Sequence, residues 1–319
     1  MSSLVSVIIP IRNRSELFSE TARSLTSQTH QHWEAIVVDD GSDPIHRDHI
    51  QSIVAGDSRM RLVPNPGPRT GASAARNAGV SSSTGEYILF FDSDDILSPT
   101  CIEQRLSRLH RDPTVDAAVS KVGFFKTKPG DLEKSLTPSK PENDLDRFLR
   151  FDIPWQTMGA MWRRDSLRRF HLQWDESALS WQDWEFHIRA VAAGLRISKS
   201  DEVDCYWRKP TPLGSTGRKH FSRRHIINRL RLIGRIADEL VERGLMTPYR
   251  RRIVRVIAFQ HAFHYGLMLP DALLAWRISR CMRLITMSEY LTGLACEGVR
   301  RSCIKFENFL YPPGLYLRP

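Results

Sequence analysis

Apolar runs and helical stretches alternate along the first hundred residues. The runs occupy residues 5–9, 35–38, 61–63 and 87–91 and are rich in Val, Ile, Leu and Phe. Residues 15–29 follow the first run, and their apolar positions recur every three or four residues, which predicts a helix. A second helix is predicted at "GASAARNAGVSSS", where Gly79 is expected to close it. Continuous apolar runs separated by helices are typical of a buried, mostly parallel sheet in an α/β domain.

The pattern changes twice in the rest of the chain. Residues 126–144, "KTKPGDLEKSLTPSKPEND", are polar and contain three prolines, which predicts an exposed loop. Helical periodicity returns in "WQDWEFHIRAVAAGLRI" and continues almost throughout beyond residue 221, where apolar positions are flanked by arginines. We therefore predict an α/β domain over residues 1–215, with halves at 1–120 and 121–215, and a basic helical region over 216–319.

Composition narrows the class of protein. Of the 319 residues, 41% are hydrophobic and 26% are charged, as in folded globular proteins. No apolar run approaches the roughly 18 residues that a membrane span needs, and the N-terminus resembles a first strand rather than a signal peptide. The five cysteines are scattered, which argues against a zinc site or a disulfide framework. We expect a cytoplasmic protein.

The net charge of +10 is unevenly distributed. Residues 1–120 carry a net charge of −4, residues 121–220 carry +4, and residues 221–319 carry +10. The C-terminal third could therefore meet an anionic surface, including the inner face of a membrane, or could be a solvated basic helical face. The same helices could equally form a homodimer interface.

Carboxylates follow two of the predicted strands directly. Asp39 and Asp40 end the second apolar run, and Asp92, Asp94 and Asp95 end the fourth. Open α/β sheets bind ligands at the carboxyl ends of their strands, and hard divalent cations prefer oxygen ligands. The alternative is that both clusters are strand-ending turns, because Asp, Gly and Ser favour turns.

Four stretches in this order resemble the family-2 glycosyltransferases with the GT-A fold. They are "VSVIIPIRNR", "SLTSQTHQHWEAIVVDDGS", "GASAARNAGVSSSTGEYILFFDSDD" and "WQDWEFHIRA", and the resemblance covers about residues 4–210. It implies a Rossmann-like sheet flanked by helices, in which residues 1–120 bind a nucleotide-sugar and residues 121–215 bind the acceptor. It also implies an enzyme that transfers a sugar, hexosyltransferase-like, in the synthesis of a polysaccharide or other glycoconjugate.

The resemblance assigns the donor site to two strand ends. Pro10, Ile11 and Arg12 would border the base, and Asp40, with Asp39 beside it, would bind the base or the ribose. The family commonly has an aromatic residue where this chain has Arg12, but a guanidinium can also stack on a base. A UDP-sugar is the expected donor.

The metal-binding Asp-x-Asp element of the family matches Asp92-Ser93-Asp94. The resemblance makes Asp94 the direct ligand of Mn²⁺ or Mg²⁺ and places Asp92 at the ribose or a metal-bound water, with Ser93 between them. Asp95 would support the site. Arg76 matches an Ala-Arg-Asn element and would help to position the nucleotide.

Asp183 matches the catalytic base of the family, in which the preceding residue is usually Glu rather than Gln182. The missing negative charge should make Asp183 easier to ionise. By resemblance, the nucleoside diphosphate leaves while an acceptor hydroxyl attacks from the opposite face, so the configuration of the sugar carbon inverts.

The acceptor, a glycan or a lipid-linked sugar, is expected to contact residues between 150 and 215. The candidates are Trp155, Gln156, Trp181, Gln182 and Trp184. Each tryptophan could equally fill the core. Arg208 lies where the family often has a segment that folds over the diphosphate, although the match is loose.

Two other classes of protein fit some of these features. A nucleotidyltransferase or phosphotransferase also places carboxylates and a metal at strand ends. A carbohydrate- or nucleic-acid-binding protein would account for the basic C-terminal third, but the acidic N-terminal part and the lack of a recognised motif argue against nucleic acid as a partner.

Overall fold

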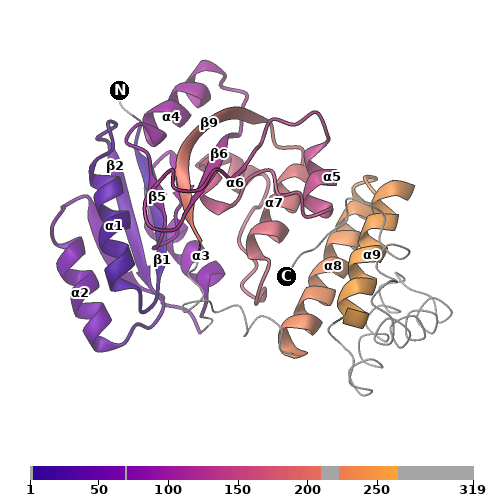
Figure 1. Cartoon of the computed structure of the whole chain (residues 1–319), viewed down its shortest axis with the longest axis horizontal. Coiled ribbons are helices and arrows are strands. Elements are labelled where there is room, and N and C mark those ends of the chain that lie inside the picture. The colour runs from indigo at the N-terminus through magenta and orange to yellow at the C-terminus, as the bar shows by residue number, and fades with distance from the viewer. Residues whose placement is uncertain (1–2, 69, 210–222, 265–319) are drawn as a thin grey trace. The chain divides into compact units, whose positions relative to one another are not determined.

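The computed structural model describes residues 3–68, 70–209 and 223–264 (Figure 1). The chain divides into two compact units. The first comprises Met1–Glu142, Ile153–Ser177 and Gln182–Ser215, and the second comprises Asn143–Asp152, Ala178–Trp181 and Thr216–Pro319. Two short segments that precede residue 215 thus belong to the second unit, a division that the sequence pattern did not predict. The function of each part stays a prediction.

The first unit is built on a single mixed sheet. Its strands are β1 (Val5–Ile11), β2 (Trp33–Asp39), β3 (Met60–Pro64), β4 (Tyr87–Phe90), β5 (Ile96–Leu97), β6 (Ala117–Phe125), β7 (Ser135–Leu136), β8 (Ala160–Arg163) and β9 (Ile197–Arg208). They are ordered β3-β2-β1-β4-β8-β6-β9-β5, and β7 pairs with β6. The first four are parallel, as predicted, and β8 is antiparallel to both of its neighbours.

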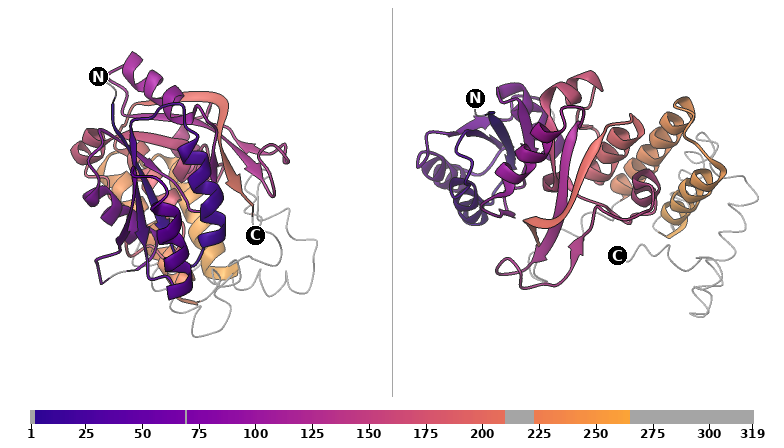
Figure 2. Two further views of the ribbon diagram at one scale, coloured as in Figure 1. Left: turned by 90° about the vertical axis from the view of Figure 1, so that its left-hand side faces the viewer. Right: turned by 90° about the horizontal axis from the view of Figure 1, so that it is seen from above.

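Helices flank this sheet. They are α1 (Ser15–Thr26), α2 (Pro44–Val54), α3 (Ala72–Ser82), α4 (Cys101–Arg111), α6 (Arg164–Arg169) and α7 (Gln182–Ala192), with a 3-10 turn η1 at Thr157–Gly159. The predicted strands and helices of the first hundred residues are all present. The 12-residue β9 runs beside β6 and is parallel to it (Figure 2), and this long pairing was not expected from the sequence.

Alternation along β1 explains why both of its faces are buried. Val5, Val7 and Ile9 share a core cluster with residues of α1 and α2. Ile8 points to the other face, because successive side chains of a strand alternate, and there it meets Gly79 of α3. A Cβ on Gly79 would collide with the Ile8 side chain. The prediction that Gly79 closes the helix was wrong, since α3 continues to Ser82 and this glycine allows close packing instead.

A buried ion pair fastens α4 to β9. Arg105 Nε donates to Asp204 Oδ2 at 2.8 Å and Arg105 Nη2 donates to Asp204 Oδ1 at 2.6 Å. Arg105 Nη1 also donates to the Met158 carbonyl at 2.6 Å. The two charged side chains are 0% and 1% exposed, so this pair lies entirely within the core.

The described part of the second unit is helical. It contains α5 (Asp144–Leu149), α8 (Arg223–Glu242) and α9 (Pro248–His264), and α9 packs against both of the others. Arg250 of α9 donates to Asp146 of α5 at 2.6 Å. None of the helices in the described ranges has a stretch long and apolar enough to cross a bilayer.

Candidate active site

The parallel register brings the predicted acidic clusters to one edge of the sheet. Ile11 pairs with Asp39, and Ile8 pairs with Phe90, so the chain leaves β1, β2 and β4 at the same end. The Asp40 backbone N–H donates to the Ile11 carbonyl at 2.9 Å, and the Phe91 N–H donates to the Ile8 carbonyl at 2.9 Å. The expectation that both clusters share an edge is therefore confirmed.

The Asp39-Asp40 turn is held by hydrogen bonds to both carboxylates. Asp39 accepts from the Ser42 N–H at 2.8 Å and from Arg47 Nε at 2.9 Å. Burial acts to raise the pKa of Asp39, but the hydrogen bonds from Ser42 and Arg47 outweigh it and lower the pKa. Asp40 accepts from Asn65 Nδ2 and from the Gly71 N–H, each at 2.7 Å.

The end of β1 forms a short loop that is bonded to this turn. Asn13 has a φ of 53°, in the left-handed region that Asn tolerates better than most residues. Its N–H donates to Ser42 Oγ at 3.1 Å, and its side chain exchanges hydrogen bonds with Asp43 at 2.9 and 2.8 Å. Of the residues predicted to border a base, Ile11 is buried in the core and Arg12 is exposed.

Each of the two carboxylates of the Asp-x-Asp element accepts a hydrogen bond from an arginine. Arg76 Nη2 donates to Asp92 Oδ1 at 2.6 Å, and Arg14 Nη1 donates to Asp94 Oδ2. Burial raises the pKa of Asp94, an effect that Arg14 and Arg208 oppose and Asp92 reinforces. The arginines thus offset part of the repulsion between the neighbouring carboxylates.

Asp95 is the most deeply buried residue of the acidic cluster and is only 1% exposed. Its Oδ1 accepts from the Arg208 N–H at 2.8 Å, whereas its Oδ2 is buried and has no hydrogen-bond partner among the described residues. Burial, followed by the charges of Asp94 and Asp92, raises the pKa of Asp95 well above its ordinary value. Asp95 thus joins the turn to the end of β9, and its role in supporting a site stays a prediction.

Arg208 at the end of β9 fastens this turn to the sheet. Its Nε donates to the Asp94 carbonyl at 2.7 Å, and its Nη2 donates to Glu20 Oε2 at 2.8 Å. The guanidinium lies 4.4 Å from the centroid of the Phe125 ring. In this arrangement Arg208 contacts the turn that contains Asp94 and Asp95.

Asp183 lies in the first turn of α7, and the charges of Arg76 and Asp92 act on its carboxylate. Its Oδ1 accepts from the Trp184 N–H at 2.9 Å. Burial raises the pKa of Asp183, an effect opposed by the Trp184 hydrogen bond and by the charge of Arg76 and reinforced by Asp92. From Gln182 we expected Asp183 to ionise more easily, because one neighbouring negative charge is absent. Burial is the larger effect and acts in the opposite direction, so the pKa of Asp183 is raised. The tertiary structure nonetheless brings Asp183 towards Arg76 and Asp92.

An aromatic group supports Arg76 and α7. The Arg76 guanidinium lies 4.3 Å from the centroid of the Trp174 ring. Trp174 in turn stacks on Phe186 of α7, with ring centroids 4.3 Å apart and an interplanar angle of 9°. Because Phe186 is three residues beyond Asp183, this stack links Arg76 to the helix that carries the predicted base.

The predicted acceptor residues fall into different surroundings. Trp155 is 0% exposed and Trp184 is 3% exposed, so both rings fill core in this structure, the alternative that the sequence left open. Gln156 is also buried. Gln182 begins α7 and is partly exposed, whereas Trp181 belongs to the second unit and packs there on Phe151, with ring centroids 4.6 Å apart. Acceptor binding by these five residues stays a prediction.

The donor set at the sheet edge suits a cation that arrives with its substrate. Among the described residues, no group of three His, Cys, Asp or Glu side chains could hold a metal ion. Asp92 and Asp94 offer two carboxylates, each with one oxygen bonded to an arginine. Mg²⁺ is typically held by one or two carboxylates plus substrate phosphates, so these residues fit a metal completed by a diphosphate.

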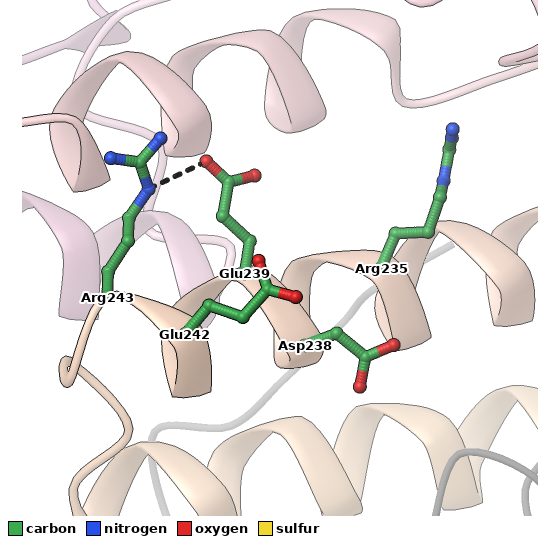
Figure 3. Close-up of a pocket in the computed structure, with 5 residues that line it drawn as sticks. All are labelled: Arg235, Asp238, Glu239, Glu242 and Arg243. Carbon is green, nitrogen blue, oxygen red and sulfur yellow. Dashed lines mark hydrogen bonds and ion pairs between the residues drawn. The ribbon is translucent and has the colours of Figure 1, made fainter.

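A hollow is found on α8 of the second unit, and none of its lining residues was predicted for the site. It is lined by Arg235, Asp238, Glu239, Glu242 and Arg243 (Figure 3). Glu239 and Arg243 form an ion pair at 2.9 Å across one helical turn. Charged side chains of both signs on one exposed helix face are typical of a solvated surface.

Sequence comparison decides the family. The model of glycosyl transferase family 2 matches residues 6–170, just over half of the 319 residues. The chain belongs to this family. The matched segment contains both acidic strand ends, and it ends before Asp183.

Relatives with curated names extend the match. The chain is 29% identical over 211 residues to the uncharacterized glycosyltransferase EpsJ of Bacillus subtilis. The aligned region covers 63% of this chain and 60% of EpsJ. It is 38% identical over 103 residues to glycosyltransferase GlyG of Streptococcus pneumoniae and to the putative teichuronic acid biosynthesis glycosyltransferase TuaG of B. subtilis. Those matches cover 32% of this chain, 34% of GlyG and 40% of TuaG.

Solved structures confirm the fold. S. aureus TarS 1–349, in complex with UDP-GlcNAc, superposes with a TM-score of 0.67 at 21% identity, covering 85% of this chain and 79% of the other. The mannosyltransferase PcManGT of Pyrobaculum calidifontis, in complex with GDP-Man and Mn²⁺, gives a TM-score of 0.55 at 18% identity, with 98% and 82% covered. The first unit therefore has the predicted GT-A fold.

One residue at the sheet edge, Arg14, was missed by the sequence reasoning. It lies only two positions from Arg12, which was singled out because it replaces an aromatic residue of the family. Arg14 ends the quoted stretch "VSVIIPIRNR", directly after a strand, and this was the available signal. No role was assigned to it, because its partner Asp94 is 80 residues away.

Proposed function

We propose that this protein is a metal-dependent, inverting glycosyltransferase that moves a sugar from a nucleoside-diphosphate sugar to an acceptor hydroxyl. The observation that carries the proposal is the packing that joins the Asp-x-Asp turn to α7: Arg76 donates to Asp92 and lies over Trp174, whose ring stacks on Phe186 of α7. We infer that Asp183, at the start of α7, acts as the base beside carboxylates and an arginine suited to a metal diphosphate. Family membership supports the same reaction class.

The donor would occupy the edge from the Asp39-Asp40 turn to the Asp-x-Asp element. The nucleoside would lie near Asp40, with Pro10, Ile11 and Arg12 beside the base. Arg76, Asp92 and Ser93 would contact the ribose and the diphosphate. We favour a uridine nucleotide, because the TarS complexes contain UDP-GlcNAc or UDP, although the PcManGT complex contains GDP-Man.

Mn²⁺ or Mg²⁺ would be held by Asp94, with Asp92 beside it. Such an ion would stabilise the negative charge that grows on the departing diphosphate. Asp95 and Arg208 hold the backbone of this turn, which fixes the direction in which Asp94 presents its carboxylate. The PcManGT complex, which contains Mn²⁺, supports this choice of ion.

Asp183 would remove the proton from the acceptor hydroxyl as that oxygen attacks the sugar carbon. Its raised pKa makes it a stronger base than an ordinary carboxylate, while Arg76 favours the ionised form that the reaction needs. A single base opposite the leaving group implies a direct displacement, so the configuration inverts and no covalent enzyme intermediate forms. The acceptor would be a glycan or a lipid-linked sugar, in the synthesis of a polysaccharide or other glycoconjugate.

The test is release of nucleoside diphosphate from a panel of UDP- and GDP-sugars with Mn²⁺ or Mg²⁺ and a range of glycan acceptors. We expect release by the wild-type protein, its loss with EDTA, and its loss in Asp94→Asn. Asp48→Asn, which changes an exposed carboxylate of α2, is the matched control and should keep full activity. Release of pyrophosphate instead would identify a nucleotidyltransferase, and full activity of Asp94→Asn would remove the metal role of that residue.

A further inference from the structure

Arg14 stands immediately before α1, and its guanidinium is bonded to the carboxylate proposed to hold the metal. Arg14 is the N-cap residue of that helix, and its Nη1 donates to Asp94 Oδ2. The arginine side chain is 44% exposed and the aspartate side chain is 23% exposed. The ion pair is thus open to water on the side of the arginine.

The other two arginines of the edge are held differently. Arg76 is 5% exposed and lies over the Trp174 ring, and Arg208 is 12% exposed and lies over the Phe125 ring. Arg208 also donates to two further groups of the edge. These two side chains are fixed by packing, whereas the charged end of Arg14 is exposed to solvent and to any ligand that enters.

The backbone at Arg14, by contrast, is well anchored. The preceding Asn13 donates to Ser42 Oγ and exchanges hydrogen bonds with Asp43, and both partners follow Asp39 and Asp40 in the chain. The Phe18 N–H donates to the Arg14 carbonyl at 3.0 Å in the first turn of α1. Arg14 therefore has a fixed base and a long side chain with a solvent-exposed end, between the turn proposed for the nucleoside and the one proposed for the metal.

A divalent cation bound to Asp94 and the Arg14 guanidinium compete for this carboxylate, because two positive charges at so short a distance repel each other. When the cation binds Asp94, the Arg14 side chain loses its partner at the moment when a diphosphate arrives with the metal. Arginine forms its strongest hydrogen bonds with carboxylates and phosphates, and its planar fork fits both. The exchange keeps the arginine paired before and after binding.

We propose that Arg14 is a diphosphate-binding residue that occupies Asp94 in the ligand-free enzyme and transfers to the diphosphate when the metal-loaded donor binds. This inference rests on the proposed function, since it needs a metal diphosphate at the sheet edge. It assigns Arg14 two opposite effects: the residue weakens binding of the metal alone and strengthens binding of the nucleotide.

The experiment measures two affinities of Arg14→Gln without any turnover. Binding of Mn²⁺ alone, followed by electron paramagnetic resonance of the free ion, should become several-fold tighter because a competitor for Asp94 is gone. Binding of UDP at saturating Mn²⁺, followed by calorimetry, should become about tenfold weaker, the effect expected for one lost hydrogen bond between charged groups. A purely structural role would weaken both affinities together.

Two further variants make the result decisive. Arg23→Gln removes the same charge from an exposed position on α1 and should leave both affinities unchanged. Arg14→Lys keeps the charge but lacks the fork, so its UDP affinity should fall between those of the wild type and Arg14→Gln. The inference is overturned if Arg14→Gln leaves UDP binding unchanged or if Mn²⁺ binding alone weakens.

The proposed function and this inference fail in different ways. If the wild-type protein binds neither UDP nor GDP with Mn²⁺ present, the proposed function is wrong, and the role of Arg14 at the diphosphate is wrong with it. If the wild type binds UDP and the two affinities of Arg14→Gln do not move in opposite directions, only the inference is wrong. Thermal unfolding of each variant confirms that the exposed substitutions leave the fold intact.

Discussion

Two arginine–aspartate pairs in the first unit have the same chemistry and opposite surroundings. Arg105 and Asp204 are 0% and 1% exposed and share two hydrogen bonds, with a third from Arg105 to a carbonyl. Arg14 and Asp94 are 44% and 23% exposed and share one. The buried pair joins α4 to β9, and its core surroundings leave no space for a ligand. The Arg14–Asp94 pair is exposed, so we expect that a ligand can take the place of either partner.

The difference shows how one residue combination serves either structure or function. A buried charge that loses its partner remains in a medium of low polarity, so a buried pair must stay closed. An exposed pair contributes little to stability, because water solvates either side chain almost as well. We therefore expect the exchangeable pair at the sheet edge, where Asp94 meets Arg14, and the permanent pair in the core.

The largest expected effect at the open edge is on catalysis rather than on stability. Asp183→Asn should lower kcat by about 10²- to 10⁴-fold, the range expected for loss of a general base. UDP binding in the presence of Mn²⁺ should persist, because Asp183 acts on the acceptor. A variant with full kcat would show that another group takes the proton, and parallel loss of UDP binding would place Asp183 in the donor site instead.

The buried pair should respond in the opposite manner. Arg105→Met leaves Asp204 buried without its partner, which is expected to lower the free energy of unfolding by about 3 to 5 kcal/mol. Urea denaturation followed by circular dichroism measures this change. The double variant Arg105→Met/Asp204→Leu should recover much of the loss, because no uncompensated charge remains. Loss of less than about 1 kcal/mol in the single variant, the value typical of a surface pair, would erase the contrast between the two pairs.

The smallest expected effect concerns Asp95, a buried carboxylate at the edge of the sheet. Burial raises its pKa above the ordinary value of 3.8, so the folded protein holds this proton more tightly than the unfolded chain does. The stabilisation from the bound proton is complete below pH 3.8 and is lost as the pH rises through the folded pKa. Asp95→Asn avoids that loss, because the amide has no charge to bury.

Thermal unfolding in EDTA tests this sign. Asp95→Asn should have a higher Tm than the wild type at pH 7.5, and the difference should shrink as the pH approaches 4. Asp48→Asn, on the exposed face of α2, should show no comparable pH dependence. A Tm for Asp95→Asn below that of the wild type at neutral pH would mean that the contacts with Arg208 stabilise the ionised carboxylate more than burial penalises it.

Local pattern was sufficient for the part of the fold that local physics controls. The first four strands and two of the helices between them, α1 and α3, were predicted, because continuous apolar runs and helical periodicity depend on neighbours in sequence. The pairing of β6 with β9 was not, since their register depends on residues about 80 positions apart, as in Ala117 with Ile197. Gly79 was misjudged for the same reason, because the Ile8 side chain that it meets lies on another element.

The sequence by itself determined which carboxylates end the strands, and it identified the Asp-x-Asp element and Asp183 as candidates for one site. Only the tertiary structure decided their partners: Arg14 for Asp94, Arg76 for Asp92, and the burial that raises the pKa of Asp183. The physical reason is that a motif is a property of adjacent residues, whereas charge balance and burial depend on side chains brought together from distant positions. Whether an aspartate belongs to a turn or to a site is fixed by those contacts.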